Sequence, residues 1–160
     1  MSGITPFLWF DDKAEEAMNL YVSLFPNSHV INVSRMGPSD GESLAPAFSV
    51  TFEINGQRFQ GMNGGPHYTF TPAVSFMVDC ETQEEIDRYW NALSDGGHEM
   101  QCGWVTDRFG VTWQIIPSCL GTLLGDADQM KAGRARDAMM SMIKFDIAAL
   151  KRAHAGGSSD

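Results

Sequence analysis

The sequence predicts an α+β fold made of two successive β-α-β-β-β modules and a helical C-terminal part. Apolar segments with strand-like alternation surround one amphipathic helical segment in the first half, and the same order returns in the second half. After Pro117 the chain becomes rich in Ala, Met, Arg and Lys, which favours helix. We therefore expect one domain over residues 1–120, with modules at about 3–65 and 72–118, a helical extension at 121–155 and a disordered tail at 156–160.

The first module combines strand alternation with one helix. Apolar residues recur at helical spacing across residues 14–25. Asp12 and Glu15 have the spacing of a capping box at the start of this helix. Asn55-Gly56 is typical of a tight hairpin turn. The strands are expected at 4–10, 29–35, 47–54 and 57–62, with an exposed polar loop at 37–46.

The second module repeats this order. Thr82 and Glu85 form another candidate capping box, and Gly96-Gly97 ends the helix that follows. Strands are expected at 73–78, within 98–105 and at 111–116. In the C-terminal part, helix is expected over 126–154 with a break at 144–146.

An internal repeat connects the two modules. By their position beside similar neighbours, Phe10 matches Val78 and Gln60 matches Gln114. Duplication of this kind predicts two copies of one supersecondary unit. Two amphipathic strand–helix units also look alike by chance, and one sequence does not decide between these explanations.

Composition disfavours several functional classes. The formal net charge of -9 would repel phosphate backbones and anionic lipid, so nucleic-acid and membrane-surface roles are not expected. Three cysteines without close pairing favour a reducing compartment over a disulfide framework. The N-terminus lacks the basic start and long apolar run of a signal peptide, and the apolar runs are too short to span a bilayer. We therefore expect a cytoplasmic protein.

Five segments together carry a family resemblance: residues 6–10, 21–28, 102–104, 107–117 and 138–147. They resemble the PhnB-like proteins, a group often labelled 3-demethylubiquinone-9 3-methyltransferase. This group is a branch of the glyoxalase, bleomycin-resistance and extradiol-dioxygenase superfamily, which has the vicinal oxygen chelate fold. The resemblance implies two modules that form a curved sheet around a cavity, with helices outside, in a homodimer.

The resemblance also maps a site onto the chain. Four positions that bind metal in the superfamily's metalloenzymes correspond here to Thr5, Gln60, Ala73 and Gln114. Because strand residues two apart share a face, a mixed face should line the cavity and an apolar face should form the core. The predicted ligand-binding residues are Thr5, Phe7, Trp9, Arg58, Gln60, Met62, Ser75, Trp104, Thr112 and Gln114. The predicted core face holds Leu8, Phe10, Phe59, Val74, Phe76, Val78, Val111, Trp113 and Ile115.

The chemistry of the mapped residues argues against a metal. Divalent metals in these enzymes need imidazole or carboxylate ligands, whereas these positions offer two amides, a hydroxyl and a methyl group. No glycine-rich loop follows a strand to hold S-adenosylmethionine. Ser75 and Cys102 lack an evident base partner for nucleophilic catalysis. We expect no metal and no cofactor, and the sequence identifies no catalytic residue.

Two functional hypotheses follow. In the first, a metal-free cavity binds a small apolar or aromatic molecule through apolar side chains and two carboxamides. Trp9 and Trp104 would stack on such a ligand or simply pack, and Arg58 would pair with an anionic group or remain a surface residue. In the second, the chain is an enzyme of the type that the family names suggest: a 3-demethylubiquinone 3-methyltransferase, a lyase, an isomerase or a dioxygenase.

Overall fold

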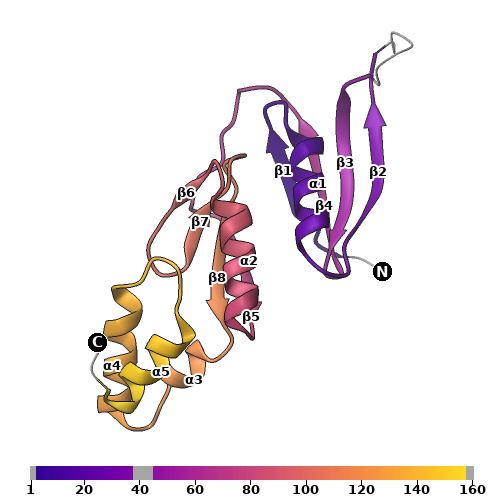
Figure 1. Ribbon diagram of the computed structural model, residues 1–160. Helices are drawn as coiled ribbons and strands as arrows, with labels where there is room; N and C mark the ends of the chain where they lie inside the picture. Colours follow the sequence, from indigo (N-terminus) through magenta and orange to yellow (C-terminus); the bar gives the residue numbers. More distant parts are fainter. Residues whose placement is uncertain (1–2, 38–44, 158–160) are drawn as a thin grey trace. The chain divides into compact units, whose positions relative to one another are not determined.

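The computed structural model describes residues 3–37 and 45–157, which belong to two compact units, Met1–Phe70 and Thr71–Asp160 (Figure 1). Within the described residues, each unit holds a four-stranded sheet with a helix against it. The α+β class predicted from the sequence is confirmed. The elements of the first unit are β1 (Phe7–Phe10), α1 (Ala14–Leu24), β2 (His29–Arg35), β3 (Ala47–Ile54) and β4 (Gln57–Asn63). Most of the predicted polar loop, residues 38–44, lies outside the described residues.

The sheet of the first unit has the order β1-β4-β3-β2. β1 is parallel to β4, whereas the β4–β3 and β3–β2 pairs are antiparallel. Helix α1 packs across β3, where Phe52 is completely buried and stacks on Phe59 with 5.5 Å between ring centroids. The face of the sheet under α1 is therefore the core of this unit, as alternation predicted.

The predicted capping box at Asp12 and Glu15 is wrong. No side chain of the N-cap residue bonds to the first turn of α1. Instead, the Ala14 N–H donates to Oδ1 of Asn63 at 2.8 Å, and Glu15 pairs with Arg35 on β2. The start of the helix is satisfied by a side chain from β4, which local sequence cannot reveal.

The second unit follows the same plan. Its sheet has the order β5-β8-β7-β6, with β5 parallel to β8. The capping box at Thr82 and Glu85 is confirmed, with both reciprocal hydrogen bonds present. Val74 is 70% exposed because β5 begins one residue later, so its predicted place in the core is wrong. The elements are β5 (Ser75–Cys80), α2 (Gln83–Ser94), β6 (His98–Glu99), β7 (Trp104–Thr106) and β8 (Thr112–Pro117).

The strand pairings correct one detail of the repeat. Phe10 lies beside Asn63 in the first ladder, and Cys80 lies beside Pro117 in the second. Asn63 and Pro117 each follow the repeated glutamine by three residues. The counterpart of Phe10 is therefore Cys80 and not Val78. The predicted match relied on similar residues ahead of the two helices, and it was wrong by two residues.

Three helices follow in the second unit: α3 (Leu120–Leu124), α4 (Gln129–Met140) and α5 (Ile147–Ala155). α3 begins one residue before the predicted helical extension (121–155), within which no separate helix was placed before residue 126, and the predicted break in the longer helix extends over residues 141–146. The segment between α4 and α5 joins the sheet region, since the N–H groups of Cys102 and Gly103 donate to the carbonyls of Met142 and Ile143, each at 2.8 Å. Within the described residues, no helix is both long and apolar enough to cross a bilayer.

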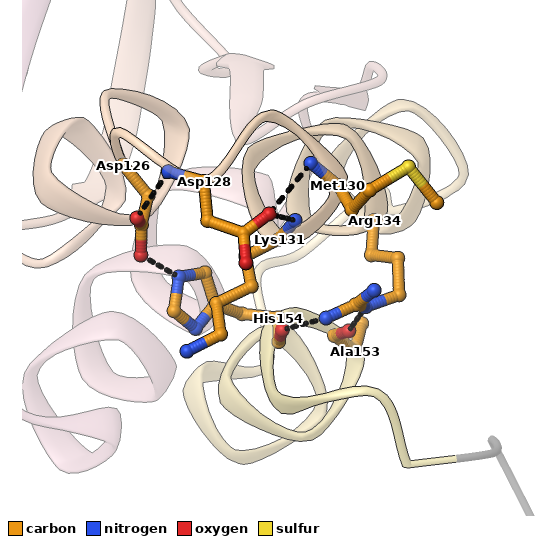
Figure 2. A network of polar contacts seen from close by, with 7 residues as sticks. All are labelled: Asp126, Asp128, Met130, Lys131, Arg134, Ala153 and His154. Atoms are coloured by element: carbon orange, nitrogen blue, oxygen red, sulfur yellow. Dashed lines mark hydrogen bonds and ion pairs between the residues drawn. The ribbon is translucent and has the colours of Figure 1, made fainter.

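Polar contacts join the C-terminal end of α5 to α4 and to the loop before α4 (Figure 2). His154 lies 2.8 Å from the carboxylate of Asp126, between Nε2 and Oδ2. The Arg134 guanidinium donates to the carbonyls of Ala153 and His154 at 3.0 and 2.9 Å. A cation on the last carbonyls of α5 complements the negative end of its helix dipole. Residues 158–160 of the predicted disordered tail lie outside the described residues.

Candidate functional site

Each sheet has a second face, opposite its packed helix, on which the predicted ligand-binding residues gather. We call these the first and second open faces. Thr5 lies just before β1 and is exposed. The first open face carries Phe7, Trp9, Arg58, Gln60 and Met62, which the β1–β4 register places together. The second open face carries Ser75, Met77, Trp104, Thr112 and Gln114.

The first open face ends in an aromatic corner formed by Trp9 and Tyr68. The Trp9 indole N–H donates to the carbonyl of Gly65 at 2.9 Å, and its ring meets Tyr68 edge-on with 5.1 Å between centroids. A Cβ on Gly64 would come within 2.3 Å of the indole, so only glycine allows this approach. His67 in turn lies edge-on to Tyr68 at 4.5 Å. The loop after β4 therefore fixes Trp9 in one orientation.

The opposite end of the first open face is polar. Gln60 lies beside Phe7 in the ladder, and Arg58 lies opposite Glu53 on β3. Arg58 is exposed, and no ion pair joins it to Glu53 in the part of the chain that the structure describes. The face thus passes from a cationic end, through an amide, to an aromatic corner.

Hydrogen bonds between side chains organise the second open face. The Gln114 Nε2 donates to the Ser75 hydroxyl at 2.8 Å, and Trp104 lies opposite Gln114 in the ladder. Thr112 is only 1% exposed, and its hydroxyl lies 3.0 Å from that of Thr106. Thr112 is therefore a buried part of this face, while Gln114 and Trp104 remain partly accessible.

The turn before β8 is held by the carboxylate of Asp107. Oδ1 of the buried Asp107 accepts hydrogen bonds from the Phe109 and Val111 N–H groups at 2.9 and 3.0 Å. Its Oδ2 accepts one from the Trp113 indole at 2.9 Å. One carboxylate thus fixes both the turn and the strand that carries Gln114. From the sequence, Asp107 was only the first residue of the resemblance segment 107–117, because its bond to the Trp113 indole forms only in the folded strand.

The residues at the mapped metal positions do not fit a divalent cation. Phe7 pairs with Gln60 and Met77 with Gln114, so two residues before each the counterpart of Thr5 is Ser75 and not Ala73, and the donors are two hydroxyls and two amides, all neutral. The amide of Gln114 already bonds to Ser75. No group of three His, Cys, Asp or Glu among the described residues is arranged to hold a metal. Such sites need charged carboxylates, thiolates or imidazoles.

Nucleophilic chemistry finds no support from the nearby side chains. Ser75 accepts a hydrogen bond from an amide, which is not a base. Burial raises the pKa of Cys80 to about 12, so its thiol stays protonated at neutral pH. Each open face instead presents partly exposed aromatic rings and amides, the groups that are typical of small-molecule sites.

Comparisons with known proteins agree with this architecture. Residues 2–116 match the family model of 3-demethylubiquinone-9 3-methyltransferase. A PhnB protein from Bacillus cereus that carries the same name is 37% identical, with a TM-score of 0.66, and the match covers 73% of this chain and 100% of that one. The chain belongs to this family. The PhnB-like assignment made from the sequence is thereby confirmed.

A second solved structure supports the fold alone. A protein from Pseudomonas aeruginosa is 22% identical, with a TM-score of 0.55, and the match covers 73% of this chain and 98% of that one. No curated protein matches the chain. The family match ends at residue 116, so α3, α4 and α5, and with them segment 138–147 of the sequence resemblance, lie outside it.

Proposed function

We propose that this PhnB-like protein binds a small apolar or aromatic molecule on its open faces without a metal ion. The observation that carries the proposal is the contrast between the two faces of each sheet. One face is closed by a helix and buried, whereas the other presents aromatic rings beside Gln60 or Gln114. A few polar groups among apolar side chains are typical of small-molecule sites.

The family's methyltransferase name receives no support from the local chemistry. Doubly wound methyltransferases hold S-adenosylmethionine with a glycine-rich turn between a strand and a helix. Here the turn between β1 and α1 is Asp11-Asp12-Lys13, and the turn between β5 and α2 is Glu81-Thr82. The sheets are also largely antiparallel. The name is therefore not a basis for assigning methyl transfer to this chain.

A ligand screen by thermal unfolding in the presence of a chelator tests the proposal. A molecule that binds only the folded state stabilises it by about 2.7 kcal/mol at one hundred times its dissociation constant. We expect planar aromatic compounds to raise the melting temperature with chelator present, and Trp9→Ala or Gln114→Ala to reduce this shift. Met130→Ala, which changes an exposed side chain on α4, is the matched control. A shift that appears only with added divalent metal would contradict the proposal.

A further inference from the structure

Side chains of different chemistry follow one another along the first open face. Their order indicates more about the ligand than that it is apolar or aromatic. Met62 lies beside Trp9 at the aromatic corner, Gln60 lies beside Phe7 in the middle, and Arg58 lies at the other end. All three residues of β4 share one face because they alternate along the strand. Their order along the strand fixes the order in which a bound molecule would meet them.

The spacing of this row sets a length. Residues two apart on a strand are about 6.7 Å apart, so Arg58 and Met62 are separated by about 13 Å. The Trp9 ring at the aromatic corner is positioned by its hydrogen bond to Gly65 and by contact with Tyr68. Tyr68 is 61% exposed and Phe7 is 55% exposed, so the rings at and near this end present accessible surface.

Arg58, at the end of the face opposite the aromatic corner, determines which chemical group of a ligand can bind there. A guanidinium recognises a carboxylate or phosphate through paired N–H donors. Glu53, opposite Arg58 on β3, lowers the local positive potential, although no ion pair joins the two side chains within the described residues. Removing the charge of Glu53 should therefore strengthen anion binding, whereas removing that of Arg58 should weaken it.

We infer that the ligand is an elongated aromatic acid, with its ring at Trp9 and Tyr68 and its anionic group at Arg58. The amide of Gln60 faces the middle of such a molecule and can bond to a polar atom there. This inference rests on the proposed function and specifies the class of molecule that the first open face selects.

Binding of ω-phenyloctanoate, measured by calorimetry with chelator present, tests the inference. Its ring and carboxylate are separated by about the length of the row from Arg58 to Met62, whereas phenylpropionate is too short to reach both ends. We expect the long acid to bind at least about tenfold more tightly than either phenylpropionate or ω-phenyloctanamide. Arg58→Gln should abolish the preference for acid over amide, and Glu53→Gln should increase it. Arg136→Gln, which changes an exposed arginine of α4, should leave it unchanged.

The outcomes separate this inference from the proposed function. Equal binding of acid and amide, or a preference for the acid that survives Arg58→Gln, would overturn the aromatic acid while leaving an aromatic binder intact. Phenylphosphate and ω-phenyloctyl phosphate, compared in the same way, show whether carboxylate or phosphate is preferred. Failure of every aromatic probe, acid or neutral, to bind would overturn both statements. Circular dichroism of each variant confirms that a loss of binding is not a loss of folding.

Discussion

The two hairpin turns that join the last two strands of the main repeat are stabilised in different ways. In the first unit, Asn55-Gly56 turns the chain through positive φ angles of 46° and 85°, and the Asn55 N–H donates to the Ser28 hydroxyl at 3.1 Å. In the second unit, the turn before β8 depends on Asp107, whose buried carboxylate accepts three hydrogen bonds. The first turn therefore relies on its backbone conformation and one exposed hydrogen bond, whereas the second relies on a buried carboxylate that also bonds to β8.

The difference predicts unequal sensitivity to substitution, beginning with the largest effect. Asp107→Ala leaves two backbone N–H groups and the Trp113 indole without their acceptor in a buried place, and should lower the free energy of unfolding by roughly 3–5 kcal/mol. Asn55→Ala retains the turn with a residue less suited to positive φ, and should cost about 1 kcal/mol. Urea unfolding measures both values. Similar losses for the two variants would refute the contrast between the turns.

This contrast also shows what the sequence can reveal. Asn55-Gly56 and the Thr82–Glu85 capping box are local patterns, and both were predictable. Asn63 caps a helix that begins 49 residues before it, and Asp107 bonds to the Trp113 indole on β8 as well as within its own turn. Periodicity therefore predicted the modules and their faces, whereas the helix cap supplied by Asn63 was misassigned and the bond from the Trp113 indole to Asp107 was missed.

Some features of the candidate site were likewise predictable from the sequence, and others were not. Alternation placed Trp9, Gln60 and Gln114 on faces opposite the helices, as the ladders show. The aromatic corner was missed because Tyr68 lies in a loop, where no periodicity relates it to Trp9. Thr112 shares its face with Gln114, yet it is buried, since burial depends on the neighbouring Thr106 as well as on strand phase.

The second unit also differs in holding the segment between α4 and α5, and Gly103 is the most sensitive point of that contact. Its φ is 78°, and a Cβ would lie 2.6 Å from both the Ile115 carbonyl and the Phe145 ring. Gly103→Ala should cost roughly 2–4 kcal/mol and release the segment. Gly133→Ala, in open space on α4, should instead stabilise by about 0.5–1 kcal/mol. Faster hydrogen exchange at the Gly103 amide reports the release, and unchanged exchange would show that the segment is held elsewhere.

A smaller effect is expected in the first unit, where Gly64 supports the aromatic corner. Gly64→Ala should displace the Trp9 ring and cost roughly 1–3 kcal/mol. The indole N–H resonance of Trp9 should shift as its bond to Gly65 is lost, and aromatic ligands should bind more weakly. Gly3→Ala, with no atom near the added methyl, is the control. An unchanged Trp9 resonance in Gly64→Ala would mean that the loop adapts without moving the ring.

The smallest expected effect concerns the contact between Asp126 and His154 and depends on pH. The Asp128 N–H, together with His154, lowers the pKa of Asp126 below its ordinary value of 3.8. A carboxyl with a lowered folded-state pKa stabilises the fold above its unfolded pKa, and this contribution disappears as the pH falls through the folded value. The stability difference between the wild type and Asp126→Asn should therefore shrink as the pH falls below about 4. Asp87→Asn removes a pair with Lys144 near α2 and should give a similar profile, because the pKa of Asp87 is also lowered, first by that lysine. Urea unfolding across this range measures both profiles, and a difference that stays constant below pH 4 would show that the charge of Asp126 contributes nothing to holding α5.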